Sequence, residues 1–329
     1  MRSVSRMAVL MLCGAVMTAG AVACSSASEC SNDSGSLQES DGSCLRFGVS
    51  TPNGPLAVGE TAAVAESVGV DPSLVLSFHD FAAVPPIGQL DAVAATGASS
   101  ILTWEPWRHY GGDDYDRGAF TMASIVAGKH DDYLYRWADE LVAHAAVVYL
   151  RFAHEPNGTW YPWSPMGGTS PDTYVAAWRH VHDLFMSKGA TNVKWVWAPN
   201  VPVAEEIRPM SDWYPGIEYV DVIGVDGYNW GTSAPGHRWT SPYDLFGSAF
   251  DELRALAPGT PLLVTEVGSA EEGGSKADWI EEFVAYLDAE QGATGFVWFE
   301  QNKEADWRLN STEEAAAAMG RALRKAGLS

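Results

Sequence analysis

The sequence predicts an α/β protein that folds as a single (β/α)8 barrel, the TIM barrel architecture. From Leu45 onward, short apolar runs rich in Val, Ile, Phe and Trp alternate with longer amphipathic stretches, which is typical of parallel strands joined by helices. Eight such runs fit within a chain of 329 residues, as the barrel requires. The rival, a doubly wound open sheet, would need a Gly-rich phosphate-binding turn after its first strand, and "GVSTPNGPL" is a poor match to one.

The elements follow in chain order. We expect eight strands, at residues 45–52, 74–81, 99–107, 147–157, 193–200, 220–229, 261–269 and 295–302. Between most of them we expect helices, at 58–69, 132–145, 170–189, 243–257 and 276–290, and a last helix at 311–327. The third of these begins with Ser170 and Pro171, an N-cap followed by a proline in the first turn.

The first residues are expected to be an export signal. Residues 1–23 contain two arginines, then an apolar stretch, then the small residues Ala21 to Ala23 just before Cys24. A transmembrane anchor is the alternative, but the short apolar core and its small-residue end disfavour it. Residues 24–44 are rich in Ser, Gly and acids and indicate a flexible tether. The (β/α)8 domain is then expected at 45–329, outside the cell or anchored to its membrane.

The cysteines suggest how this segment is processed. Removal of the signal leaves Cys24, Cys30 and Cys44, which is an odd number. "AVAC" resembles a bacterial lipoprotein box, so we expect a lipid on Cys24 and a disulfide between Cys30 and Cys44 in an oxidising compartment. Ordinary secretion with one free thiol, or a Cys24–Cys30 bridge, stays open as an alternative.

The charge restricts the partners. A formal net charge of −22 repels nucleic acid and anionic membranes, so we expect neither as a partner beyond a lipid anchor. An uncharged ligand is compatible with this charge, and 14 tryptophans could supply flat apolar surfaces for sugar rings. No zinc-binding spacing is present, and we expect no metal, no cofactor and a monomeric protein.

Polar or aromatic residues lie at most of the expected strand ends. In a (β/α)8 barrel the carboxyl ends of the strands surround one mouth, where catalytic residues are found. The residues at these ends are His79, Asp80, Trp104, Glu105, His154, Glu155, Asn200, Asp226, Tyr228, Glu266, Trp298 and Glu300.

Two of these acids are candidates for catalysis. Glu155 ends the fourth expected strand and Glu266 ends the seventh, so a closed barrel brings them to the same mouth. A pair of carboxyl groups across a sugar-sized cleft can hydrolyse a glycosidic bond, one as the acid and the other as nucleophile or base. The alternative is that each glutamate is a solvated loop residue.

Four segments carry a resemblance to a known family. "RFAHEPNGTWYPW", "VDVIGVDGYNW", "LLVTEVG" and "GFVWF" resemble glycoside hydrolase family 26, which contains retaining endo-β-mannanases and some β-1,3-1,4-glucanases on a (β/α)8 barrel. The resemblance runs from about Leu45 to the last helix. It implies Glu155 as the acid/base and Glu266 as the nucleophile, roles that their spacing alone does not assign.

The resemblance also implies a set of substrate-binding residues. These are His154, Trp160, Tyr228 and Trp298, together with His79 and Trp104, which depend more on their strand-end positions. Tyr228 would hydrogen-bond the nucleophile, and we expect Trp160 and Trp298 to be stacking surfaces for sugars. Pro156 departs from the family, where Met is commoner, and we expect it to hold Glu155 in an extended conformation.

The implied activity is the endo-hydrolysis of a β-1,4-mannan-type polysaccharide. A β-1,3-1,4-glucanase of the same fold is the first alternative, and the sequence does not separate mannan from mixed-linkage glucan or xylan, or endo from exo action. A lipoprotein that binds sugar without cleaving it is the alternative from another class. Such proteins usually have two α/β lobes, whereas this sequence predicts one barrel.

Overall fold

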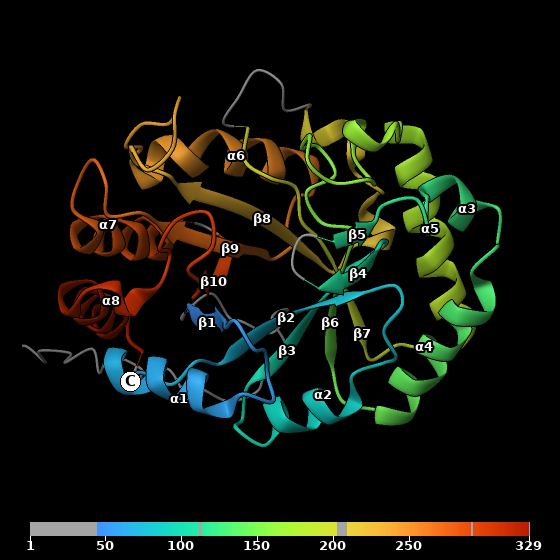
Figure 1. Cartoon of the computed structure of the whole chain (residues 1–329), viewed down its shortest axis with the longest axis horizontal. Coiled ribbons are helices and arrows are strands. Elements are labelled where there is room, and N and C mark those ends of the chain that lie inside the picture. Colours follow the sequence, from blue (N-terminus) through green and yellow to red (C-terminus); the bar gives the residue numbers. More distant parts are fainter. Residues whose placement is uncertain (1–44, 112–113, 203–208, 291, 329) are drawn as a thin grey trace, which may run out of the picture.

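The computed structural model describes residues 45–111, 114–202, 209–290 and 292–328. Its centre is a closed barrel whose neighbouring strands are all parallel, in the order β1-β10-β9-β8-β7-β6-β3-β2 (Figure 1). These strands are β1 (Arg46–Ser50), β2 (Leu74–Asp80), β3 (Ser99–Glu105), β6 (Val148–Phe152), β7 (Val193–Trp197), β8 (Val222–Asn229), β9 (Leu262–Ser269) and β10 (Ala293–Phe299). Each falls within or overlaps an expected strand, so the predicted barrel is confirmed.

Helices surround the barrel (Figure 1). They are α1 (Val58–Val68), α2 (Ile87–Ala94), α3 (Met122–Val126), α4 (Asp131–His144), α5 (Pro171–Ser187), α6 (Pro242–Leu256), α7 (Lys276–Ala289) and α8 (Glu313–Lys325). The six expected helices are confirmed. Helices α2 and α3 were not predicted, since they span only eight and five residues and show too little periodicity.

Hydroxyl side chains fix where several helices begin. The Ser170 side chain accepts a hydrogen bond from the backbone N–H of Thr173 at 3.2 Å, and Pro171 follows in the first turn of α5. Ser241 and Ser275 cap α6 and α7 in the same way. Each cap gives a partner to a backbone N–H that the first helical turn leaves free, worth about 1 kcal/mol.

The core has two layers because side chains alternate along each strand. One set fills the barrel interior: Leu74, Leu76, Ile101, Tyr149, Val196, Val222, Leu263 and Val297. The intervening residues face the helices and join a much larger cluster that is rich in tryptophan. The position of a strand residue in this alternation therefore decides whether its side chain can reach the barrel mouth.

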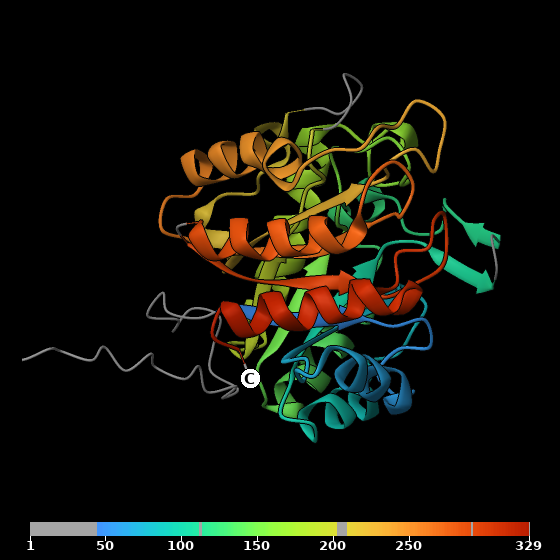
Figure 2. The same ribbon diagram turned by 90° about the vertical axis from the view of Figure 1, so that its left-hand side faces the viewer.

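A β-hairpin after β3 was not predicted. Strands β4 (Arg108–Gly111) and β5 (Asp114–Asp116) pair antiparallel, and Figure 2 shows them projecting from the end of the barrel toward which its strands run. The Tyr115 ring stacks on His109, at a centroid distance of 4.7 Å, and packs against Trp107, at 4.2 Å. The hairpin thus extends one wall of the barrel mouth.

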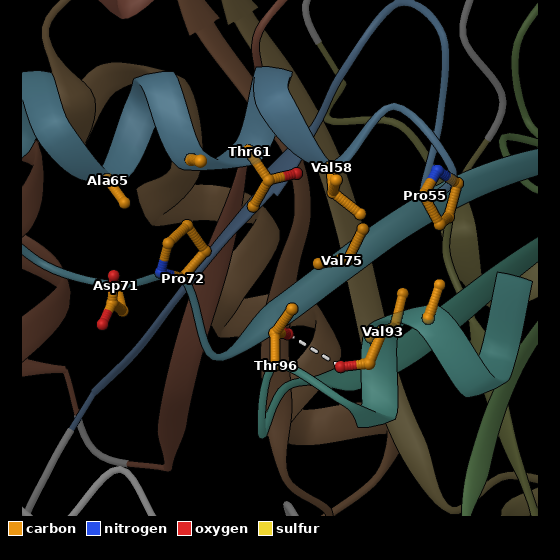
Figure 3. A pocket seen from close by; sticks show the side chains of 11 residues that line it. Pro55, Val58, Thr61, Ala65, Asp71, Pro72, Val75, Val93 and Thr96 are labelled. Atoms are coloured by element: carbon orange, nitrogen blue, oxygen red, sulfur yellow. Dashed lines mark hydrogen bonds between the residues drawn. The ribbon is translucent and has the colours of Figure 1, made fainter.

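A small cavity of about 200 Å³ lies away from this mouth, between α1, β2 and α2. Figure 3 shows that its lining is mostly small and apolar, with Val58, Val75 and Val93 among the labelled residues. Asp71 is the one ionisable residue in this lining, so the cavity offers no pair of groups for acid–base chemistry.

Candidate active site

Glu155 lies in a strained turn that follows β6. Ala153 and Glu155 have φ angles of 46° and 49°, in the left-handed region that costs a non-glycine residue about 1–2 kcal/mol. Two hydrogen bonds hold the turn: the N–H of Ala153 donates to the Trp104 carbonyl at 3.0 Å, and the N–H of Glu155 donates to the Ala198 carbonyl at 2.6 Å. The expectation that Pro156 keeps Glu155 extended is therefore wrong, because these neighbouring-strand contacts outweigh the preference of a residue before proline.

Both carboxylate oxygens of Glu155 accept hydrogen bonds. The Asn200 Nδ2 donates to Oε1 at 2.7 Å, and the Trp160 indole Nε1 donates to Oε2 at 2.5 Å. Asn200 is itself fixed by the buried Asn157, which accepts from its backbone N–H at 2.9 Å and donates to its carbonyl at 2.8 Å. The turn after β6 and the segment that follows β7 thus orient this carboxyl group together.

Glu266 points into the barrel because of a β-bulge in β9. The register with β8 moves from Val225↔Val264 to Asp226↔Glu266, so Thr265 has no partner in the ladder. Thr265 and Glu266 therefore both face the interior, where their side chains contact Asp226 and Arg151. Bulges next to active sites re-aim side chains in this way.

The Glu266 carboxylate is held by two strong donors. One oxygen accepts from the Arg151 guanidinium, and the other accepts from the Tyr228 hydroxyl at 2.6 Å. The His154 Nε2 lies 3.9 Å from Glu266 Oε1 and 3.0 Å from the Tyr161 hydroxyl. The expected contact between Tyr228 and Glu266 is confirmed.

Arg151 forms the base of the site. Its side chain is fully buried, and besides Glu266 it contacts Asp226 Oδ2 at 2.7 Å and the Thr103 hydroxyl at 2.8 Å. Asp226 also accepts from Thr265. We did not predict this network. A charged residue within each of the apolar runs "VVYLRF" and "VIGVDGYN" is the signal that could have revealed it.

The two glutamates lie in different electrostatic environments. Burial, and then the charge of Glu266, raise the pKa of Glu155 to about 7. Burial, reinforced by the positive charge of Arg151, holds the pKa of His154 well below its usual value. At neutral pH the site therefore pairs a protonatable Glu155 with a Glu266 that is held by Arg151, and His154 is neutral beside them.

Both glutamates border a cleft of about 610 Å³ at the barrel mouth. Its walls are rich in aromatic rings, which are suited to the apolar faces of sugars. The rings are Phe78, Trp107, Tyr115, Trp160, Tyr161, Tyr228, Trp230, His237, Phe299 and Trp307. Several of these, including Trp107, Trp230 and Trp307, were not among the expected substrate-binding residues.

Three of the six expected substrate-binding residues lie at this site. Trp160 and Tyr228 line the cleft, and the Trp160 side chain is 37% exposed. His154 is buried just beneath, in contact with Tyr161 and close to Glu266.

The other three expected residues face the helices. Trp298 is fully buried, its indole donates to the Trp307 carbonyl at 2.7 Å, and the prediction that it is a stacking surface is wrong. Trp104 is also a core residue, stacked on Trp137 at 4.4 Å. His79 contacts Ser77 at 2.9 Å on the helix side of β2. In each case strand alternation turns the side chain away from the mouth, where the neighbouring Phe78, Glu105 or Phe299 points inward instead.

The described ranges contain neither a cluster of metal-binding side chains nor a membrane-spanning helix. No group of three or more His, Cys, Asp or Glu side chains there could hold a metal ion. Across the same residues, no helix has the length and apolarity needed to cross a bilayer. Cys24, Cys30 and Cys44 lie outside the described residues.

The comparisons with known proteins agree on one family. The model described as "Glycosyl hydrolase family 26" matches residues 125–319. Endoglucanase H of Acetivibrio thermocellus is 39% identical over 250 residues, covering 74% of this chain and 26% of that protein. Mannan endo-1,4-beta-mannosidase A and B of Caldalkalibacillus mannanilyticus is 26% identical over 182 residues, covering 52% of this chain. The chain spans 26% and 32% of the lengths of these two curated relatives.

Solved structures share the fold. The catalytic domain of a Bacillus sp. JAMB-750 endo-beta-1,4-mannanase has a TM-score of 0.66 and 19% identity, with 89% of each chain covered. The GH26 domain of a Prevotella bryantii endo-beta-mannanase/endo-beta-glucanase has a TM-score of 0.64 and 18% identity, covering 84% of this chain and 89% of that one.

Proposed function

Because this chain belongs to glycosyl hydrolase family 26, we propose that it is a retaining endo-β-glycanase in which Glu155 and Glu266 carry the reaction. The observation that supports this best is the contrast between the two carboxyl groups in one aromatic cleft. Glu266 is held by the cationic Arg151, whereas burial and the charge of Glu266 raise the pKa of Glu155 to about 7. An acid and a nucleophile need this difference.

In the first proposed step, a Glu266 oxygen attacks the anomeric carbon as the glycosidic C–O bond breaks. Glu155 transfers its proton to the departing oxygen, and a glycosyl ester forms on Glu266. The Tyr228 hydroxyl and the Arg151 guanidinium orient the attacking carboxylate.

In the second step, water replaces the ester. Esterification removes the charge of Glu266, so the pKa of Glu155 falls and its carboxylate can accept a proton. Water attacks the anomeric carbon and gives that proton to Glu155, and the ester C–O bond breaks to restore the Glu266 carboxylate. The sugar is released with its original configuration.

We propose β-1,4-mannan as a substrate class, because the mannosidases among the relatives share the family. A β-glucan is the second candidate, and one observation favours it: identity to Endoglucanase H is 39%, against 26% to the mannosidase of C. mannanilyticus. Endo action is likewise inferred from the names of these relatives.

The substrate test is a panel of four polysaccharides, namely mannan, glucomannan, lichenan and xylan, with reducing ends measured over time. We expect release from at least one of them, and loss of that release in a folded Glu266→Gln variant. A folded wild-type protein that binds one of these glycans and cleaves none would contradict the proposal and support the sugar-binding alternative.

We also propose that the protein acts outside the cell, attached through a lipid on Cys24 and with a Cys30–Cys44 disulfide. The export-signal pattern of residues 1–23 and the odd number of remaining cysteines support this. Mass spectrometry of the protein purified from its natural membrane fraction tests it. An unmodified Cys24, or a Cys24–Cys30 bridge, would contradict it.

A further inference from the structure

A third carboxyl group, Glu105, faces the barrel interior at the same mouth. It is the last residue of β3 and follows an alternation in which Ile101 joins the inner cluster and Thr103 contacts Arg151. Glu105 comes next on this inward face. The mechanism proposed above does not use it.

Glu105 is almost buried, with 8% of its surface exposed. Its Oε2 accepts a hydrogen bond at 3.3 Å from the indole of Trp107, a ring that lines the cleft. Among the described residues, no group makes a hydrogen bond to the Oε1 of Glu105. That oxygen is not completely shielded from solvent. One oxygen of Glu105 is thus anchored to the cleft wall, and the other is not fully enclosed.

Glu105 lies next to the network that holds Glu266, because Thr103, the preceding inward residue of β3, contacts the Arg151 that binds Glu266. The charges of Arg151, Glu266 and Lys303 all act on the pKa of Glu105. Burial is the largest effect and raises the pKa of Glu105 to about 8. A neutral Glu105 can donate as well as accept a hydrogen bond, and it does not repel the Glu266 carboxylate.

We propose that Glu105 binds a hydroxyl group of the sugar unit next to Glu266 and helps to discriminate manno- from gluco-configured β-glycans. Mannose and glucose differ only in the direction of the 2-hydroxyl, which lies on the carbon adjacent to the anomeric carbon that Glu266 attacks. A buried polar group left without its hydroxyl partner is unfavourable, so one such contact can discriminate strongly. This inference rests on the proposed function.

The test compares Glu105→Ala with the wild-type protein on mannan and on lichenan. We expect kcat/KM on the better substrate to fall about tenfold or more, as the loss of one buried hydrogen bond implies. The ratio of kcat/KM between the two substrates should also change about tenfold. Glu105→Gln keeps a donor and an acceptor at the same position and should recover most of the wild-type ratio.

Glu300→Gln is the matched control. Glu300 is also a buried glutamate near the end of a barrel strand, but its Oε2 accepts from the backbone N–H of Leu309 at 2.6 Å and its Oε1 is fully enclosed by protein. The control should leave the substrate ratio unchanged. If Glu105→Ala does not fold, Glu105→Asp replaces it in the test. This variant withdraws the carboxyl group by one methylene and should change the ratio of kcat/KM between the two substrates.

Binding gives a second readout. Binding is measured by calorimetry in a Glu266→Gln background, with a manno-oligosaccharide and with a mixed-linkage gluco-oligosaccharide. Glu105→Ala should lower the affinity for one oligosaccharide more than the affinity for the other. Equal losses of kcat/KM on both substrates, or unchanged binding of both oligosaccharides, would overturn the role of Glu105. A wild-type protein that hydrolyses neither polysaccharide would instead overturn the proposed function.

Discussion

The hydrogen bond from Asn200 to Glu155 should set the alkaline limit of activity. The Asn200 side chain contacts Glu155 Oε1 at 2.7 Å, whereas the contacts of Asn200 with Asn157 are made by its backbone. Asn200→Ala therefore removes the bond to Glu155 and keeps the local fold. Because this bond stabilises the ionised carboxylate more than the neutral acid, its loss raises the pKa of Glu155.

The size of this shift follows from hydrogen-bond strengths. A bond to a charged group contributes about 1.5–3 kcal/mol, and a bond to a neutral group about 0.5–1.5 kcal/mol. Their difference of about 1–1.5 kcal/mol corresponds to roughly one pKa unit. With the pKa of Glu155 at about 7 in the wild type, we expect about 8 in the variant.

The assay is the pH dependence of kcat/KM on the preferred polysaccharide. The first step needs protonated Glu155, so activity is present below its pKa and is lost as pH rises through it. Asn200→Ala should therefore lower kcat/KM at its optimum but move the alkaline limb to higher pH. Asn192→Ala, whose side chain contacts the Leu141 and Ala146 carbonyls, is the control and should leave the limb in place. An unmoved limb, or one that moves to lower pH, would refute this reasoning.

Two further predictions concern the base of the site and the tryptophans. Arg151→Met leaves Glu266 and Asp226 without their buried cation, so we expect the unfolding free energy at pH 7 to fall by about 3–5 kcal/mol. Urea denaturation measures this loss, and equal stability of variant and wild type would show that the network is not needed for folding. Trp298→Ala should lower the unfolding free energy by about 3–5 kcal/mol as a core truncation, while Trp160→Ala should weaken turnover on polysaccharide with a small change in melting temperature. A reversal of these two outcomes would contradict the burial of Trp298 and the exposure of Trp160.

The barrel could be predicted because its signal is repeated along the chain. Each strand is a short, nearly continuous apolar run, which is typical of parallel strands that are buried on both faces. Helices α2 and α3 and the β4–β5 hairpin were missed because each is short, and the hairpin residues are mostly exposed. Such short elements are stabilised mainly by tertiary contacts, and their own sequences show little hydrophobic periodicity.

The site could be predicted only in part, because strand ends are ambiguous by one residue. Trp298 and Phe299 are adjacent, yet the first faces α7 and the second faces the cleft. A shift of one position reverses the face. The bulge at Thr265 adds to this ambiguity, since it turns two successive residues inward and no local sequence pattern marks it. Glu266 was nevertheless predicted from its position at a strand end, and the resemblance added its role as the nucleophile.

The stereochemistry of the first product tests the central claim most directly. Proton NMR of the anomeric signals, recorded during early hydrolysis of the preferred β-glycan, distinguishes the two ways in which paired carboxyl groups can act. Double displacement through an ester on Glu266 predicts that the β-anomer appears first and that the α-anomer follows only by mutarotation. An α-anomer formed first would contradict the account, because it would mean that water attacks the sugar directly and that Glu266 is a base.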